Sequence, residues 1–279
     1  MQASDFAGAV QDFSIRSAAT QFSNVILQGK QGSLSNYRIS VNYAERDNDR
    51  GGRHRHNFEQ IRFPMEGEFI YTKDKVVPTG SVAYFPEGAY YGPQLRRKGT
   101  RMMVCQFGGA SGHGYLGIEQ RQASYEALSA KGHFEKGYYT YKDEDGKRHN
   151  QDAFEAVWEH AMGKKLEYPT PRYPDVVIMN PANFSWVGDA NMPGVERKWI
   201  GKFTERNTRI GFIRVDAGAT LTAGQHDAPE VLFLVSGSVH CQDRTYAKHS
   251  AFGFEPGEGE VPIAAKEVSE ICSIQFPKF

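Results

Sequence analysis

The chain has 279 residues, with 33 basic and 33 acidic side chains and a formal net charge of zero. This balance gives no overall field that would favour nucleic acid or an anionic membrane. No apolar run approaches the roughly 20 residues that span a bilayer. The length allows two domains of about 100 to 150 residues each.

The cysteines are few and far apart, at Cys105, Cys241 and Cys272, each in an apolar, strand-like segment. Such a set indicates buried core thiols in a reducing compartment rather than a disulfide framework. The N-terminal segment carries Asp5 and lacks the apolar stretch of a signal peptide. We therefore expect a cytoplasmic protein.

From Asn24 to Gly108 the chain has the pattern of successive short strands. The segments are rich in β-branched and aromatic residues, and Gly, Pro, Asp or Asn separates them. They read NVILQG, YRISVNY, QIRFPMEGEFIYT, SVAYFPEG and RMMVCQFGG. This pattern predicts an all-β sandwich or barrel.

The pattern changes after residue 118 and returns near residue 187. IEQRQASYEALSAKG and NQDAFEAVWEHAMG have helical spacing, with the charged turn KDEDGKRHN before the second, and LEYPTPRYPD reads as a Pro-rich linker. Strand-like segments then continue to the end. We expect a first barrel over 1–110, a helical connector and linker over 111–185, and a second barrel over 186–279.

The two β halves show the offsets of a diverged internal repeat. QIRFPMEG aligns with EVLFLVSG, so that Gln60 precedes Gly67 as Glu230 precedes Gly237. A histidine lies four residues before each polar residue. Independent sheets would share strand alternation, but these shared polar and glycine offsets favour a duplicated unit.

At these residues the first half resembles the cupin superfamily. His54-Arg55-His56, then Gln60 and Gly67, follow the first cupin motif with Gln in place of Glu. Gly80, Pro86-Glu87-Gly88 and Tyr91 follow the second motif, with Tyr in place of the last His. The second half matches less well. The resemblance implies a bicupin, an all-β chain with two jelly-roll barrels.

Strand alternation determines which side chains of the first motif can meet. Alternate residues of a strand face the same side. One face carries His54, His56, Phe58, Gln60 and Arg62. Glu59 points to the other face. An inward even face would gather two imidazoles and an amide oxygen, a donor set for a catalytic metal with open positions. We expect iron first, with Mn, Ni, Zn or Cu as alternatives.

Tyr91 stands where the last cupin histidine would lie, and three interpretations remain open. It could bind the metal as a phenolate, act as a protonated hydrogen-bond donor or general acid, or pack as an aromatic residue without metal.

Arg62 is an unusual residue for an inward strand position. Either a bulge turns it to solvent, or it faces inward and must be paired. The second interpretation predicts an anionic or phenolic substrate, because a guanidinium binds carboxylate or phosphate well. The expected pocket would also contain Phe58, Tyr84 and Met102.

The second half keeps fewer polar residues on the corresponding face. His226 and Glu230 are two candidate ligands, followed by Leu232 and Leu234. This set favours a structural role for the second barrel over a second active site.

Two functional hypotheses follow, and the choice of reaction rests on analogy. The first is a mononuclear-metal enzyme, with an oxygenase acting on a small phenolic, diketone or carboxylate compound as the leading case and lyase or isomerase chemistry as variants. The second is a cupin that binds metal weakly or not at all. It would act as a small-molecule binding module, or as a cyclase or isomerase using Tyr91 and Arg62. The expected partner is a small molecule, and the resemblance implies a homodimer.

Overall fold

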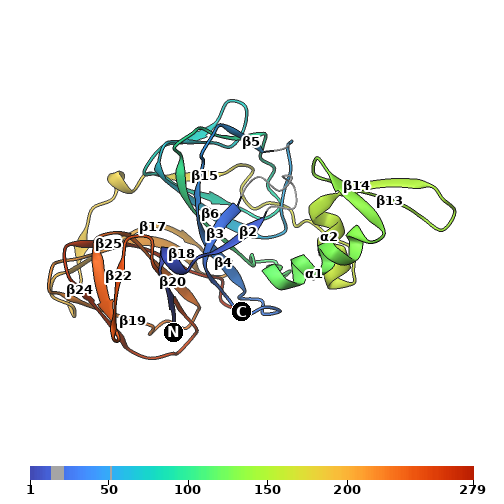
Figure 1. The fold of residues 1–279 in the computed structure, drawn as a ribbon. Helices are drawn as coiled ribbons and strands as arrows, with labels where there is room; N and C mark the ends of the chain where they lie inside the picture. The colour runs from blue at the N-terminus through green and yellow to red at the C-terminus, as the bar shows by residue number, and fades with distance from the viewer. Residues whose placement is uncertain (14–21, 51) are drawn as a thin grey trace.

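The computed structural model describes the whole chain except residues 14–21 and 51. The described residues form two β-sandwiches and a smaller connector that extends to one side (Figure 1). The all-β class with two jelly-roll barrels is confirmed.

The first barrel pairs a seven-stranded sheet with a four-stranded sheet. The larger sheet contains β2 (Val10–Phe13), β3 (Phe22–Gln28), β4 (Tyr37–Tyr43), β6 (Glu59–Glu66), β9 (Val82–Phe85), β11 (Arg101–Phe107) and β15 (Val177–Met179). The smaller contains β5 (Asn48–Arg50), β7 (Phe69–Ile70), β8 (Val76–Val77) and β10 (Gln94–Arg96).

The second barrel repeats this arrangement. Its larger sheet contains β1 (Gln2–Ser4), β16 (Val187–Gly188), β17 (Val195–Phe203), β18 (Thr208–Val215), β20 (Glu230–Ser236), β23 (Ala251–Phe254) and β25 (Ser269–Gln275). Its smaller sheet contains β19 (Thr220–Ala223), β21 (Ser238–Cys241), β22 (Arg244–Ala247) and β24 (Val261–Ala265).

The two large sheets have equivalent strand orders, β9-β6-β11-β4-β3 and β23-β20-β25-β18-β17, as expected of an internal repeat. Each sheet gains an edge strand from the segment that precedes the opposite barrel: β15 pairs with β9, and β1 pairs with β23. Residues 2–4 and 177–179 therefore cross the expected domain boundaries. Such short strands carry too little sequence pattern to be placed in a sheet in advance.

The barrels pack against each other through the outer faces of their large sheets. Phe63 and Phe212 meet across this interface with ring centroids 5.6 Å apart, and Tyr84 stacks on Phe203 at 3.9 Å. Cys105 and Cys272 lie in the same cluster, while Cys241 lies inside the second barrel. All three cysteines are free and buried, so the prediction of core thiols is confirmed.

The connector is not purely helical. It contains the expected helices α1 (Ile118–Ser129) and α2 (Ala153–Met162), but also the antiparallel strands β12 (Gly132–Glu135), β13 (Tyr138–Lys142) and β14 (Arg148–Asp152). The charged turn joins β13 to β14, and this hairpin points away from the barrels (Figure 1). Two short 3-10 helices, η1 (Phe6–Gly8) and η2 (Pro181–Asn183), complete the described elements.

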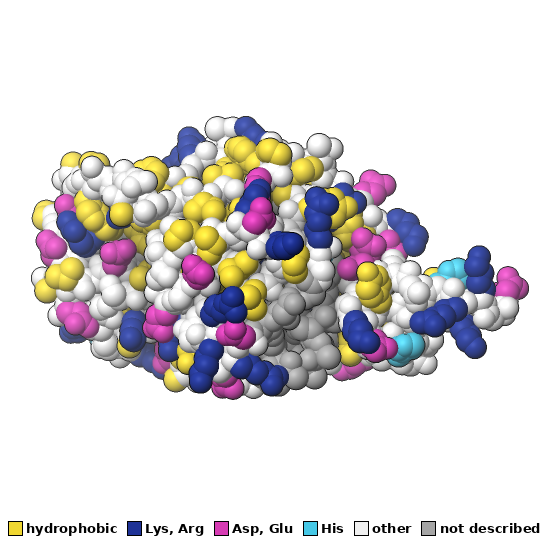
Figure 2. Space-filling view, turned by 90° about the horizontal axis from the view of Figure 1, so that it is seen from above, with side chains coloured by type: hydrophobic (Ala, Val, Ile, Leu, Met, Phe, Trp, Pro, Cys, Tyr) yellow, Lys and Arg dark blue, Asp and Glu magenta, His cyan; other side chains and the backbone are white. Residues whose placement is uncertain are grey.

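The surface agrees with the balanced composition. Figure 2 shows acidic and basic side chains interspersed over the face seen from above. No helix in the described part of the chain is long and apolar enough to cross a membrane.

Candidate functional site

The residues predicted for the first-barrel site come together. Gln60 and Arg62 lie on β6, while His54 and His56 lie in the loop before it. His54 and Tyr91 exchange two backbone hydrogen bonds of 2.9 Å, which fasten the histidine loop to the loop before β10. Arg62 is 5% exposed, so it faces the barrel interior rather than solvent.

Hydrogen bonds link the polar side chains of this interior into one network. Gln60 Nε2 donates to Tyr91 Oη at 2.7 Å, and Arg62 Nη2 donates to Gln60 Oε1 at 2.9 Å. Gln106 Nε2 also donates to Gln60 Oε1, at 3.0 Å. Both lone pairs of the Gln60 carbonyl oxygen are therefore occupied by donors.

Arg62 is held entirely by neutral groups. Its Nη1 donates to Gln94 Oε1 at 2.6 Å, and its Nη2 lies 3.2 Å from Tyr91 Oη. Its guanidinium also lies over the rings of Phe69 and Phe85, at 4.7 and 4.8 Å. Its Nε is buried without a hydrogen bond, and no described carboxylate pairs with the group. Burial lowers the pKa of Arg62, which reflects the cost of this desolvated charge.

The two histidines are oriented differently. His54 Nδ1 lies 2.8 Å from the Gly52 carbonyl, which fixes the proton on Nδ1, and its Nε2 lies 3.3 Å from the Gln94 amide nitrogen. The His56 ring stacks on Phe58 at 4.4 Å and meets Phe154 of α2 edge-on at 5.0 Å. The connector thus packs against the mouth of the first barrel.

Comparisons with known sequences find no match. No protein-family model matches the chain, and no curated protein matches it either.

Solved structures do match, at low sequence identity. A candidate dioxygenase from Nostoc punctiforme is 11% identical with a TM-score of 0.63, covering 99% of this chain and 82% of its own. Pirin from Escherichia coli, solved with nickel(II), is 10% identical with a TM-score of 0.54, covering 100% and 99%. A mutant of oxalate decarboxylase from Bacillus subtilis is 10% identical with a TM-score of 0.53, covering 100% and 78%. These are cupin-fold proteins. The chain has the bicupin fold.

The first-barrel residues of this bicupin do not fit a tightly held metal ion. The described residues contain no group of three or more His, Cys, Asp or Glu side chains placed to hold one. Gln60 Oε1 is already occupied, and the Arg62 guanidinium adds positive charge that no described acidic side chain offsets. Binding a divalent ion here would require the network to rearrange. The ligand set of His54, His56 and Gln60 therefore stays a prediction.

The expected substrate pocket needs one correction. Met102 faces the interior of the first barrel, and Phe58 packs at its mouth with the connector. Tyr84 lies instead on the opposite face of the sheet, in the interface with the second barrel. It pairs with Ile61 across the sheet, and cross-strand partners share a face. In β9, Phe85 is the residue that faces inward.

Sequence reasoning named Gln94 only as a neighbour that could substitute for Tyr91, and it missed Gln106. Gln106 lies directly opposite Gln60 on β11, and its Oε1 accepts from Arg38 Nη2 at 2.9 Å and Tyr115 Oη at 3.0 Å. Gln94 on β10 holds Arg62. Each of these residues lies at an inward strand position, so correct strand pairing would have found them.

Glu59 lies on the face opposite Gln60, as alternation predicts. It accepts a hydrogen bond from the Tyr84 hydroxyl in the interface with the second barrel. Burial raises the pKa of Glu59 to about 8, and the nearby Glu87 carboxylate adds to this shift. This acid therefore cannot contribute to the first-barrel site.

Proposed function

We propose that the first barrel binds a small organic anion beside Arg62 and acts on it by proton transfer, without a tightly held metal. One observation carries the proposal: Arg62 is buried, charged and surrounded only by amides, a phenol and aromatic rings. A buried charge without a counter-charge is costly unless a ligand supplies one. A carboxylate or phenolate would do so, and the aromatic walls favour a substrate with an apolar body.

Tyr91 is the proposed proton donor. Its Oη accepts hydrogen bonds from Gln60 Nε2 and Arg62 Nη2, so its own proton is not used within that pair of contacts. The same two donors would stabilise the phenolate left after the proton moves to the substrate. The imidazoles of His54 and His56 flank the Tyr91 ring, with centroids at 4.5 and 5.9 Å, and supply a base to receive a substrate proton. Proton donation by Tyr91 together with proton removal by a histidine supports isomerase, cyclase or lyase chemistry.

A metal-dependent oxygenase is the second candidate. His54 Nδ1 contacts a backbone carbonyl, as the second ring nitrogen of a metal-binding histidine usually does. Its Nε2 then carries the lone pair that would bind an ion. The nickel(II) in the similar E. coli pirin and the candidate dioxygenase from N. punctiforme support this alternative. His54 and His56 would hold the ion, which would act as a Lewis acid.

The proposal is tested by comparing benzoate with its neutral isostere benzamide in titration calorimetry. We expect benzoate to bind, benzamide to bind weakly, and Arg62→Met to weaken benzoate binding about tenfold or more. Arg62→Lys keeps the charge and should keep part of the affinity. Equal binding of both compounds, or unchanged binding in Arg62→Met, would overturn the proposal.

Elemental analysis separates the two candidates. We expect no stoichiometric metal in the purified protein. Stoichiometric Fe, Mn, Ni, Zn or Cu that is lost in the His54→Ala, His56→Ala double variant would establish the metal-dependent alternative instead.

A further inference from the structure

The second barrel repeats a row of polar residues found in the first. On β4, β11 and β6, Arg38 lies opposite Gln106, which lies opposite Gln60. On β18, β25 and β20, Arg209 lies opposite Gln275, which lies opposite Glu230. The row survives in the second barrel although the cupin motif does not.

The two rows differ in how their hydrogen bonds are satisfied. In the first barrel Arg38 donates to Gln106 at 2.9 Å, and Gln106 donates to Gln60 at 3.0 Å. In the second, Gln275 Nε2 is buried beside the Glu230 carboxylate, yet it makes no hydrogen bond of ordinary length within the described residues. Gln275 is only 6% exposed. Buried donors normally have acceptors, so the Gln275 amide, with the Arg209 guanidinium opposite it, indicates that an acceptor from outside the protein completes the row.

Glu230 lies opposite Gln275 in the same row. It is 2% exposed, and Ser273 Oγ donates to its Oε1 at 2.7 Å. His226 Nε2 lies 3.4 Å from Glu230 Oε2, and the imidazole is 39% exposed, so it marks the opening. Leu232 and Leu234 follow Glu230 on β20 and are at most 1% exposed, so the barrel interior beyond Glu230 is packed and only a small ligand would fit beside it.

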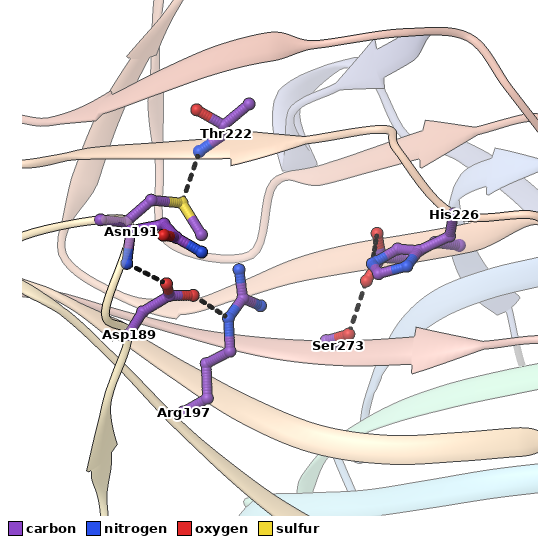
Figure 3. Close-up of polar contacts among 8 residues, drawn as sticks. Asp189, Asn191, Arg197, Thr222, His226 and Ser273 are labelled. Carbon is purple, nitrogen blue, oxygen red and sulfur yellow. Dashed lines mark hydrogen bonds and ion pairs between the residues drawn. The ribbon is translucent and has the colours of Figure 1, made fainter.

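Arg197 forms the facing wall. Figure 3 shows its guanidinium between Asp189 on one side and the residues His226 and Ser273 on the other. Its Nε donates to Asp189 Oδ2 at 3.1 Å, and Asp189 is fixed by the Asn191 backbone N–H at 3.0 Å. Within the described residues, the Nη atoms of Arg197 have no hydrogen bond, so they remain available to a ligand.

Trp199 covers the remaining side. Gly211, the neighbour of Ser273 across the sheet, has no side chain, and a Cβ there would lie 2.7 Å from the Trp199 ring. The ring therefore lies over this glycine, with the Arg209 guanidinium 5.9 Å from its centroid. Trp199 is positioned to report on anything that binds beside Arg209.

We propose that this mouth of the second barrel is a separate binding site for a small hydroxy acid. The ligand carboxylate accepts hydrogen bonds from Arg209 and Gln275, and its hydroxyl donates to Glu230. Asp189 and Glu230 both face Arg197 and offset its charge, which leaves Arg209 to balance the ligand carboxylate. A cation is disfavoured, because two guanidinium groups border the space and only His226 and Glu230 could bind a metal.

The test is a titration with glycolate, followed through the indole N–H signals of the three tryptophans, Trp158, Trp186 and Trp199, in a ¹⁵N-labelled protein. We expect a saturable shift of the Trp199 signal alone, assigned with Trp199→Phe. Acetate and ethylene glycol each lack one of the two groups and should bind about tenfold more weakly.

Two variants make the test specific. Arg209→Gln and Gln275→Leu should each weaken the Trp199 response about tenfold, so the conclusion does not depend on the folding of one of them. Arg62→Met is the control, since it removes anion binding in the first barrel and should leave the Trp199 response unchanged. No saturable Trp199 shift, equal shifts of all three signals, or loss of the response in Arg62→Met would each overturn the proposal.

Discussion

The side chain of Gln60 both donates and accepts hydrogen bonds: its Nε2 bonds Tyr91, and its Oε1 accepts from Arg62 and Gln106. A glutamate at this position would instead give Arg62 an internal counter-charge at the same place. The amide therefore keeps the guanidinium uncompensated while still orienting it. For the proposed anion site, this means that Gln60 leaves Arg62 able to pair with a ligand, whereas a carboxylate at position 60 would pair with Arg62 itself.

Replacing Gln60 with Glu should abolish most of the anion affinity. The new carboxylate would pair with Arg62, so we expect Gln60→Glu to bind benzoate about tenfold more weakly or worse in titration calorimetry. Gln106→Glu is the matched control, because it adds the same charge to the network without a hydrogen bond to Arg62. Equal losses in both variants, or none in Gln60→Glu, would contradict this account of Arg62.

His249 is expected to destabilise the protein in acid. Its ring packs near Phe6 and Phe233. Burial lowers its pKa, Arg101 and Lys248 lower it further, and Glu66 opposes them. Because the pKa of His249 is lower in the folded protein, the unfolded chain binds a proton at this histidine at a higher pH than the folded protein does. The contribution of neutral His249 to the free energy of unfolding is complete above its unfolded-state pKa of about 6.5. It is lost as the pH falls through the lower pKa of His249 in the folded protein.

The variant His249→Asn tests this pH dependence. Asparagine tolerates the positive φ of 72° at this position, so the turn should be kept. Urea unfolding at about pH 5 and about pH 8 should show a smaller loss of unfolding free energy in acid for the variant than for the original protein. A constant difference between the two proteins at both pH values would exclude His249 as the cause.

At the scale of elements, local sequence patterns predicted strand faces and helix positions correctly, but they did not predict which strands pair or in which register. Alternation correctly put Glu59 on the opposite face from Gln60, and helical spacing placed α1 and α2. Tyr84 was misplaced, because its face depends on which residue of β6 it pairs with, and that register is not local information. For the same reason the sequence did not predict Gln106, the contact of Gln94 with Arg62, the connector sheet or the exchanged edge strands.

Helix α2 should control access to the histidines of the first barrel. Its Phe154 ring lies 5.0 Å from His56 and 5.6 Å from Phe58. We expect Phe154→Ala to lower the free energy of unfolding by about 3 kcal/mol and to weaken the packing of α2 against the barrel. Hydrogen exchange should then become faster in residues 153–162 and also in residues 54–58.

Phe134→Ala provides the comparison within the connector. Phe134 is partly buried against the same cluster as Phe154, but its ring contacts are with Tyr125 at 4.4 Å and Tyr139 at 4.8 Å rather than with a histidine. It should speed exchange in the connector but leave residues 54–58 protected. Equal exchange at residues 54–58 in the two variants would show that α2 does not protect the mouth.

At the scale of the whole molecule, two features tie the barrels together. They share a buried cluster that includes Phe63 and Phe212, and each completes the large sheet of the other with an edge strand. Exchanged edges leave no open strand beside β9 or β23 for another chain to pair with. Homodimerisation, expected from the resemblance, stays a prediction; the edges of the two large sheets are β15 and β2 in the first barrel and β1 and β16 in the second.

These links predict that the two barrels unfold as one cooperative unit. Phe252 is fully buried inside the second barrel, so Phe252→Ala should cost about 3 to 5 kcal/mol there. If the barrels are coupled, Phe252→Ala lowers two denaturant midpoints together. One is measured by amide protection of β11 in the first barrel, and the other by Trp199 fluorescence in the second. Phe85→Ala, a buried phenylalanine of the first barrel, should have the reciprocal effect on Trp199. Two separate midpoints, with the unmutated barrel unchanged, would show that the shared cluster and exchanged strands join the barrels without coupling their stability.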